Sequence, residues 1–277
     1  MKKNLLLSSL LFLAFACAFA QSPTVMTYNI KYDNKEDQVN NWNFRKEAMV
    51  DLIHNQRPDV IGMQEVLHRQ LEFLDKGLDN YAYVGVGRDD GKEKGEYSPI
   101  FYNSSEYEVL ESNTFWLSRS PEKVSVGWDA SMERICTYAR FREKKSQKEF
   151  WMFNTHFDHR GDKARKKSVR LILKKIDEIN SENLPVVLTG DLNLLPEQAP
   201  IQYLSKRMSD GLETSRKKNE GPHGTFNGFN LEDPISNRID YIFTRGFSVN
   251  NYQHIDERLE NDNHISDHLP VVAELVR

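Results

Sequence analysis

The sequence predicts an α/β fold in which helices cover the outer faces of β-sheets. Short apolar stretches, rich in β-branched and aromatic residues and bounded by polar or turn residues, recur along the chain and are typical of strands. Amphipathic stretches with helical periodicity are interleaved with them. The composition, 39% hydrophobic and 11% aromatic, is sufficient for a buried core. Strands that alternate with helices in this way indicate the α/β class.

The first 20 residues are predicted to be a signal peptide and are set aside from the fold. A positively charged start is followed by the apolar run Leu5–Phe19, and small residues flank Phe19 as they do at a signal peptidase site. We expect cleavage between Ala20 and Gln21, which predicts an exported protein, periplasmic or secreted. Residues 21–277 are then expected to form a single catalytic domain.

Two other interpretations of the N-terminal segment are less favoured. Lipoprotein processing at Cys17 would follow the small Ala16, but Phe15 is bulky and Ala14 stands where the lipobox pattern has Leu. The apolar run is also shorter than the about 20 residues that a membrane-spanning helix needs. We therefore expect no stable membrane insertion.

The helices are predicted from apolar side chains that recur every three or four residues. In Asn43–Asn55 this places Phe44, Met49 and Leu52 on one face, and His68–Leu78 and Ala164–Ile179 repeat the pattern. The strands are predicted where such periodicity gives way to short apolar runs. In chain order they are Val25–Ile30, Val60–Met63, Tyr81–Val86, Ile100–Tyr102, Phe150–Asn154, Val186–Thr189, Ile239–Phe243 and Val271–Leu275.

Polar groups lie inside or directly beside six of these strands. Burying a charge is costly unless it is paired or bound to a metal, so six separate placements are better explained by convergence on one site. The residues concerned are Asn29, Glu65, His156, Asp158, Asp191, Asn193, Asp240, Asp267 and His268.

The chemistry of this set predicts a divalent metal ion. Carboxylate and amide oxygens suit a hard cation, Mg²⁺ or Mn²⁺. Glu65 is the best candidate ligand, with Asn29 and Asp267 near it. Such an ion would polarise a phosphoryl oxygen and neutralise the charge that develops in the transition state.

The remaining residues predict acid–base chemistry on a water molecule. We expect Asp240 to hold His268 in one tautomer, because a carboxylate commonly orients a catalytic histidine in this way. Asp191 and Asn193 would position or deprotonate the attacking water, and His156 would donate to a phosphate oxygen. The base is left open between Asp191 and His268.

Six motifs give the chain a resemblance to a known family. TYNI, MQEV, NTHFDH, TGDLN, RIDYIF and SDHLPV occur, from Thr27 to Val272, in the order of the endonuclease/exonuclease/phosphatase superfamily, which has the DNase I-like fold. The resemblance implies a four-layer α/β sandwich of two packed mixed β-sheets flanked by helices. It also implies a hydrolase acting on phosphate ester bonds, with the roles given above carried onto the same residues.

Differences from the family's branches narrow the resemblance. Lys31 stands where abasic-site endonucleases have a second acid, and Ile239 and Tyr241 flank Asp240 where inositol polyphosphate 5-phosphatases have Cys and Arg. GEYSPIFY, ERICTYARF and HGTFNGF are most similar to a bacterial exported branch, which itself resembles deadenylase-like members. Arg134 and Tyr97 in these stretches, and Asp158 in NTHFDH, are predicted substrate contacts.

The expected function is metal-dependent hydrolysis of a phosphorylated substrate, either a small molecule or nucleic acid. The net charge of -4 favours a small or monomeric substrate over long duplex DNA, since DNA-binding proteins usually carry a basic surplus. Two alternatives stay open. One is a non-catalytic binding module that kept the scaffold; the other is a sphingomyelinase-like phospholipid phosphodiesterase, although no apolar hairpin for a lipid surface is present in the sequence. The sequence implies no protein partner.

Overall fold

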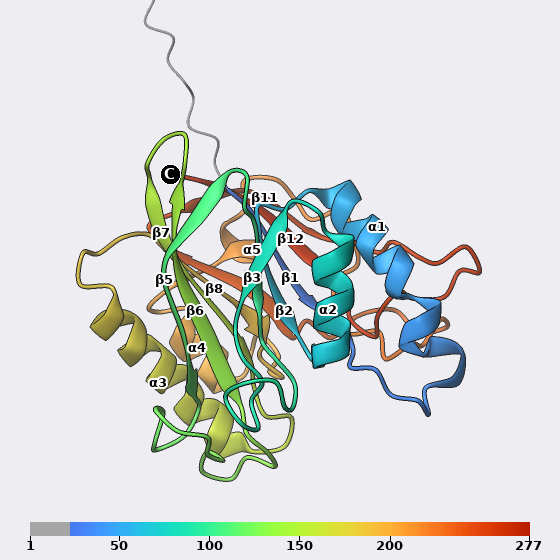
Figure 1. The fold of residues 1–277 in the computed structure, drawn as a ribbon, viewed down its shortest axis with the longest axis horizontal. Coiled ribbons are helices and arrows are strands. Elements are labelled where there is room, and N and C mark those ends of the chain that lie inside the picture. Colours follow the sequence, from blue (N-terminus) through green and yellow to red (C-terminus); the bar gives the residue numbers. More distant parts are fainter. Residues whose placement is uncertain (1–22) are drawn as a thin grey trace, which may run out of the picture.

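Two six-stranded β-sheets pack face to face in the computed structural model, which describes residues 23–277 (Figure 1). The predicted signal peptide and the alternative at Cys17 lie outside these residues. The first sheet has the order β11 (Ser248–His254), β12 (Val271–Val276), β1 (Thr24–Asn29), β2 (Val60–Gln64), β4 (Ile100–Asn103), β3 (Tyr81–Val84). The second has the order β5 (Tyr107–Trp116), β6 (Ile135–Glu143), β7 (Glu149–His156), β8 (Val186–Asp191), β10 (Asp240–Arg245), β9 (Ser209–Asp210).

Both sheets are mixed, and helices cover their outer faces. The pairs β1–β2 and β7–β8 are parallel, and the other pairs are antiparallel. The long helices are α1 (Lys46–Gln56) and α2 (His68–Gly77) on the first sheet and α3 (Asp162–Ile179) on the second (Figure 1). Shorter elements are α4 (Ala199–Leu204), α5 (Gly211–Thr214) and the 3-10 turns η1 (Gln38–Asn40) and η2 (Trp42–Phe44). The predicted four-layer α/β sandwich is confirmed.

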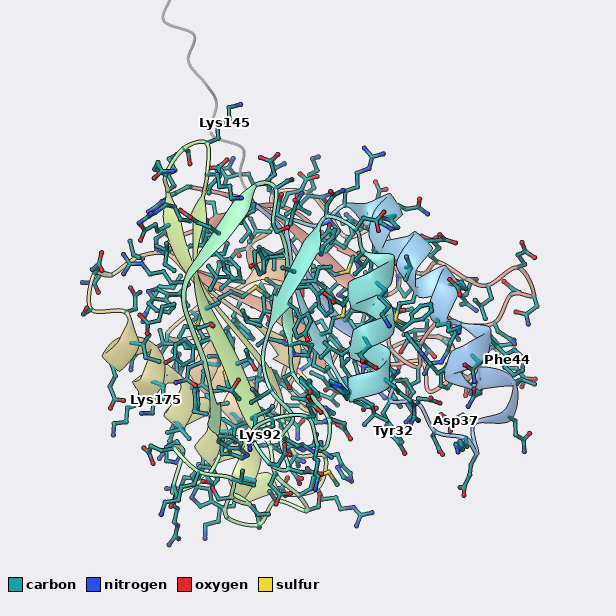
Figure 2. All side chains as sticks on the ribbon, in the orientation of Figure 1. Tyr32, Asp37, Phe44, Lys92, Lys145 and Lys175 are labelled. Carbon is teal, nitrogen blue, oxygen red and sulfur yellow. The ribbon has the colours of Figure 1, made fainter. Side chains whose placement is uncertain are left out.

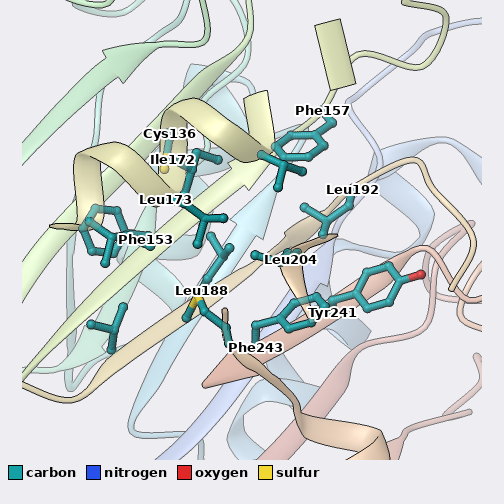
Figure 3. Close-up of a cluster of buried hydrophobic side chains, with 14 of the residues drawn as sticks. Cys136, Phe153, Phe157, Ile172, Leu173, Leu188, Leu192, Leu204, Tyr241 and Phe243 are labelled. Atoms are coloured by element: carbon teal, nitrogen blue, oxygen red, sulfur yellow. The ribbon is translucent and has the colours of Figure 1, made fainter. Parts of the chain in front are cut away.

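Three hydrophobic cores separate the four layers. One lies between the sheets and includes Val25, Val187 and Ile242, and another lies between the first sheet and helices α1 and α2. The third joins the second sheet to α3 and α4, and Figure 3 shows its side chains, with Leu188 and Phe243 beside Leu173. A buried side chain of this size contributes roughly 1.5–3 kcal/mol on leaving water. These cores therefore fix the positions of the strands that carry the polar residues.

The strands alternate between the two cores along their length. Successive side chains of a strand point to opposite faces. In β1, Met26 and Tyr28 face the helices, while Val25 lies in the core between the sheets and is followed on the same face by Thr27 and Asn29. The same alternation turns the polar ends of β7, β8 and β10 toward the space between the sheets.

The start of α1 differs from the prediction. We expected a helix from Asn43 with Phe44 on its buried face, but α1 begins at Lys46 after two 3-10 turns, and Phe44 is 68% exposed. Trp42 is buried in its place, packed edge-on against Phe73 at 5.9 Å between ring centroids. Figure 2 places Phe44 at the edge of the molecule.

The cap of α3 comes from a distant part of the chain. Asp162 is the first helical residue, and its carboxylate pairs with Arg165 and caps no backbone nitrogen. Asp129 caps the helix instead, accepting hydrogen bonds from the backbone nitrogens of Lys163 at 3.1 Å and Ala164 at 2.6 Å. A carboxylate at this end also interacts favourably with the helix dipole.

A layer of hydrogen-bonded polar side chains crosses between the sheets. Gln64 of β2 donates to Asn154 Oδ1 at 2.7 Å and to Thr27 Oγ1 at 3.0 Å, and Thr189 Oγ1 donates to Asn154 Oδ1 at 3.0 Å. Asn154 in turn donates to the Met63 carbonyl at 2.7 Å. Such groups cost free energy when buried unless their partners are present, so this layer fixes how the two sheets align.

Glycine at position 62 is required by this layer. A Cβ built there would lie 2.3 Å from Thr189 Oγ1 and 2.5 Å from Asn154 Oδ1.

Among the described residues, none of the helices is long and apolar enough to cross a membrane.

We predict that Gly62→Ala lowers the free energy of unfolding by about 1–3 kcal/mol, because overpacking forces the polar layer apart. Urea denaturation followed by far-UV circular dichroism measures the change. Gly77→Ala is the control: it lies at the end of α2, where a Cβ would meet a side-chain methyl group of Val50 at 3.0 Å. A Gly62→Ala protein as stable as the wild type would contradict this account of the layer.

Candidate active site

Three neighbouring strands bring polar side chains to one end of the second sheet. His156 pairs in register with Asp191 across the parallel strands β7 and β8, and Asp240 pairs with Asp191 across β8 and β10. From the facing sheet, Asn29 ends β1 and reaches Asp191 Oδ2 through its Nδ2 at 3.0 Å. The polar strand ends predicted to converge therefore do meet, between the two sheets.

Left-handed backbone follows three of the strands that carry the site. Lys31, Glu65 and Asn193 have φ values of 57°, 61° and 49°, a conformation that residues other than glycine seldom adopt. Strain of this kind persists only where surrounding structure holds it, and it gathers at functional sites. Here it turns the chain sharply just beyond β1, β2 and β8.

His268 lies between two carboxylates. Its Nδ1 is 2.8 Å from Asp240 Oδ2, and its Nε2 is 3.7 Å from Asp191 Oδ2. Asp240 is fully buried, and the same oxygen accepts a hydrogen bond from Thr225 Oγ1 at 2.6 Å. The expected contact between Asp240 and His268 is thus present, and the neighbouring hydroxyl of Thr225 orients it.

The two carboxylates favour a protonated His268. Burial alone would lower the pKa of His268, but Asp240 and Asp191 outweigh it and raise that pKa to about 10. Burial raises the pKa of Asp191, and the charge of Asp240 raises it further. These groups share protons as one unit, and the proton resides preferentially on His268.

Asn29 links the two acids on either side of it. Its Nδ2 donates to Glu65 Oε1 at 3.1 Å as well as to Asp191, and its Oδ1 accepts from the backbone nitrogen of Lys31 at 3.1 Å. Asn29 is therefore present at the predicted position but acts as a donor to carboxylates. Its Oδ1 accepts a single hydrogen bond and keeps a second lone pair that could bind a metal ion.

Glu65 and Asp267 lie on either side of an ammonium group. Lys31 Nζ is 3.5 Å from Asp267 Oδ2 and 4.0 Å from Glu65 Oε2. Glu65 Oε2 also accepts from the backbone nitrogen of Tyr32 at 3.1 Å. In the sequence, Lys31 was notable only because it stands where abasic-site endonucleases have a second acid. The structure places its positive charge beside both predicted metal ligands.

His156 is held as a neutral imidazole. Burial, followed by the nearby charges of Arg134 and Arg88, lowers the pKa of His156 well below its ordinary value. Asn193 Nδ2 donates to the Phe157 carbonyl at 3.1 Å and lies 3.1 Å from His156 Nε2. Because the carbonyl can only accept, the Asn193 nitrogen faces both groups, so Nε2 accepts and the proton of His156 resides on Nδ1.

Arg134 is buried with unused donors. Only 5% of it is exposed; its Nη2 is 3.2 Å from His159 Nδ1, and its Nε is 3.6 Å from Asp158 Oδ2. Within residues 23–277, Nε and Nη1 of Arg134 and Nδ1 of His156 find no hydrogen-bond acceptor. Buried donors without an acceptor are uncommon, and a water, an ion or a ligand can supply the missing partner.

The other two predicted substrate contacts already have protein partners. Asp158 accepts hydrogen bonds from Ser131 Oγ at 2.7 Å and Gly161 N at 2.7 Å, which hold its pKa below the ordinary value despite burial. Tyr97 is 3% exposed, and its hydroxyl is 3.0 Å from Nδ1 of His68. Asp158 therefore organises the loop before α3, and Tyr97 packs against α2.

Sequence reasoning did not identify the segment that holds the 266–268 motif. Asn227 Nδ2 donates to the Ser266 carbonyl at 3.0 Å, and the backbone nitrogen of Leu269 donates to the Thr225 carbonyl at 2.6 Å. The ring of Phe226 packs edge-on against His268 at 5.0 Å between centroids. The stretch HGTFNGF (residues 223–229) indicated only a resemblance to the family. Its role beside His268 was not predicted, because Thr, Asn and Phe are common in turns and cores.

Known proteins resemble this chain in sequence and in fold. A model of the Endonuclease/Exonuclease/phosphatase family matches residues 26–268. A crystal structure of an endonuclease/exonuclease/phosphatase from Bacteroides vulgatus is 40% identical with a TM-score of 0.87, covering 92% of this chain and 99% of that one. The mannosyl-6-phosphatase structure from Bacteroides thetaiotaomicron is 36% identical with a TM-score of 0.86, covering 92% and 100%. Protein angel of Drosophila melanogaster is 28% identical over 61% of this chain and 48% of its own length.

We predict that Asp240→Asn lowers the pKa of His268, by roughly 1–3 pH units, because a neutral amide no longer stabilises the imidazolium. A raised pKa means that the folded state binds this proton more tightly than the unfolded state does. The pair therefore stabilises the fold fully below the ordinary value of 6.5, and this contribution is lost as pH rises through about 10.

Nuclear magnetic resonance titration of the His268 ring in metal-free protein measures this pKa, and urea denaturation across the same pH range measures the stability. Thr225→Val is the control, because it removes a hydrogen bond to Asp240 and leaves its charge. An unchanged His268 titration in Asp240→Asn would contradict the pairing.

Proposed function

The chain belongs to the endonuclease/exonuclease/phosphatase family, whose members hydrolyse phosphate esters, and we propose that it is a divalent-metal-dependent phosphatase acting on a small phosphorylated molecule. One observation carries the proposal. His268 is held through Nδ1 by the buried Asp240, and its Nε2 faces Asp191 and Asn29, at 3.7 Å and 3.4 Å. An oriented imidazole beside acids that can hold a metal is an arrangement suited to phosphoryl transfer to water.

Two sets of residues fit a metal ion. Asp191, Asp240 and His268 offer ligand atoms that all lie within 4.8 Å of one another. In that set, however, Asp240 Oδ2 already accepts from both His268 and Thr225, so an ion there would disrupt a buried pair. We favour Glu65 and Asp267, whose oxygens suit Mg²⁺ or Mn²⁺, with Asn29 beside them. Bound there, the ion would polarise a phosphoryl oxygen and neutralise developing charge.

The chain's own residues divide the proton transfers between them. Asp191, with its pKa raised by burial and by Asp240, is suited to take a proton from the attacking water near neutral pH. The protonated His268 donates a hydrogen bond to a phosphoryl oxygen, and the alkoxide that leaves takes a proton from solvent. Asn193 orients Asp191 through its backbone nitrogen, which donates to Asp191 Oδ1 at 2.9 Å, and neutral His156 offers its Nδ1 proton to the substrate.

Arg134 supports a monoester substrate. A phosphomonoester carries one more anionic oxygen than a diester, and the unused donors of Arg134 lie close to His156, whose pKa its charge lowers. The similarity to mannosyl-6-phosphatase, over that whole chain, favours a sugar phosphate or a compound of that size. The net charge of -4 agrees with a small substrate more than with long nucleic acid.

The alternatives give different outcomes. A phosphodiesterase or nuclease, including a sphingomyelinase-like enzyme, would prefer diesters. A non-catalytic binding module would turn over neither class, although Glu65, Asp191, Asp240 and His268 are all present.

We also propose that the protein is exported, on the strength of residues 1–20.

We predict metal-dependent hydrolysis of p-nitrophenyl phosphate and sugar phosphates, with slower turnover of bis-p-nitrophenyl phosphate and none in EDTA. Protein for this assay is purified from the exported fraction. N-terminal sequencing of this protein tests the export proposal, which predicts that the mature chain begins at Gln21. His268→Ala should lower kcat by about 10²–10⁴-fold. No metal-dependent turnover across a broad panel would rule out the enzyme, and full activity in His268→Ala would rule out this mechanism.

We predict that Arg134→Met lowers kcat/KM for monoesters by about 10–100-fold, as expected when a charged hydrogen-bonding group is lost, and affects diesters less. Steady-state kinetics on both substrate classes provides the measurement. Arg140→Met is the control: Arg140 lies on β6, the strand that begins directly after Arg134, and its guanidinium pairs with Glu149 and Glu182. Equal losses on both substrate classes would contradict a role for Arg134 in monoester preference.

A further inference from the structure

A lysine of this chain already occupies the space between the acids proposed to hold the metal. Lys31 Nζ is 3.5 Å from Asp267 Oδ2 and 4.0 Å from Glu65 Oε2. The side chain of Lys31 is 21% exposed, and those of Glu65 and Asp267 are 14% and 11% exposed. At such burial, water and salt screen the three charges far less than they screen a surface ion pair.

The backbone of Lys31 is built to keep it there. Its left-handed conformation, with φ of 57°, is held by hydrogen bonds from Arg45 Nη2 at 2.8 Å and Gln70 Nε2 at 3.0 Å to its carbonyl. Its backbone nitrogen donates to Asn29 Oδ1 at 3.1 Å. These contacts fix the backbone from which the Lys31 side chain extends toward the two acids.

The aromatic ring of the next residue supports the same position. Lys31 Nζ lies 4.5 Å from the ring centroid of Tyr32, within range of a cation–π interaction. Tyr32 also donates its backbone nitrogen to Glu65 Oε2. Lys31 and Glu65 both contact Tyr32, which holds the two side chains beside each other.

A fixed ammonium at this place has a consequence for metal binding. It neutralises part of the carboxylate charge that would attract a divalent ion, and it repels that ion directly. The ammonium therefore lowers the affinity of these two acids for a divalent ion.

We propose that Lys31 is a resident counter-cation of Glu65 and Asp267, which weakens the affinity of this site for its divalent ion. The inference rests on the proposed function, because it assumes that these acids hold the metal. A lysine that served only to bind the substrate phosphate would leave metal affinity unchanged when removed.

The experiment measures Mn²⁺ binding by isothermal titration calorimetry on the full protein without substrate. Lys31→Met keeps a Cβ at the left-handed position and most of the side-chain length but removes the charge. We expect it to bind Mn²⁺ about tenfold or more tightly than the wild type, and Lys31→Arg to bind close to wild type. Lys35→Met, which removes an exposed lysine nearby, controls for the change in net charge.

The outcomes separate the two proposals. If the wild type and Lys31→Met both fail to bind Mn²⁺, the metal-dependent function fails with the inference. If the wild type binds Mn²⁺, Glu65→Gln weakens binding, and Lys31→Met binds no more tightly than wild type, the inference alone is overturned. Thermal unfolding without metal verifies that each variant is folded, and the rise in Tm on adding Mn²⁺ must follow the same order as the affinities.

Discussion

The alternation of side chains along the strands is the constraint on which the rest of this structure depends. Every second residue of β1, β7, β8 and β10 faces the space between the sheets, and that space changes in character along its length. It is apolar around Val25 and Ile242, hydrogen-bonded around Asn154 and Thr189, and charged at Asp191. A shift of one residue in any of these strands would turn its polar end toward a helix-covered core, where no partner could satisfy it. Packing and site geometry are therefore fixed together.

The site is organised before any ligand arrives because its polar groups satisfy one another across strands. Asn29 bridges Glu65 and Asp191, Thr225 and Asp240 orient His268, and Asn193 sets the tautomer of His156. Each of these links joins residues far apart in the sequence, so the geometry is lost unless both sheets fold. Arg134 and His156 are among the buried side chains with nitrogens that have no partner within the described residues, and we propose that an anion binds beside these two.

The sequence predicted the parts of the fold whose residues are uniformly apolar. β1, β2, β8 and β12 were recognisable because their runs are short and apolar, and the polar residues at their ends indicated the site. β5 was not predicted, because its middle, Glu111 to Asn113, is exposed and a bulge interrupts it after Val109. β6 carries Arg140 and Arg142 on its outer face, which disguises the alternation. The Asp129 cap, the burial of Arg134 and the position of the Lys31 ammonium all depend on contacts distant in sequence, which periodicity and motifs cannot reveal.

Charge balance explains why these particular residues surround the acids. A site that holds a divalent ion needs ionised carboxylates, yet a phosphate monoester that approaches those carboxylates is itself anionic. Lys31 on one flank, beside Glu65 and Asp267, and Arg134 on the other, near His156, reduce this repulsion. Both cations are largely buried and fixed, so little freedom is lost when the substrate binds. A chain with an acid in place of Lys31 would hold its metal more tightly but would add another negative charge where the phosphate must enter. Under the proposed function, the position of Lys31 favours admission of an anionic substrate over strength of metal binding.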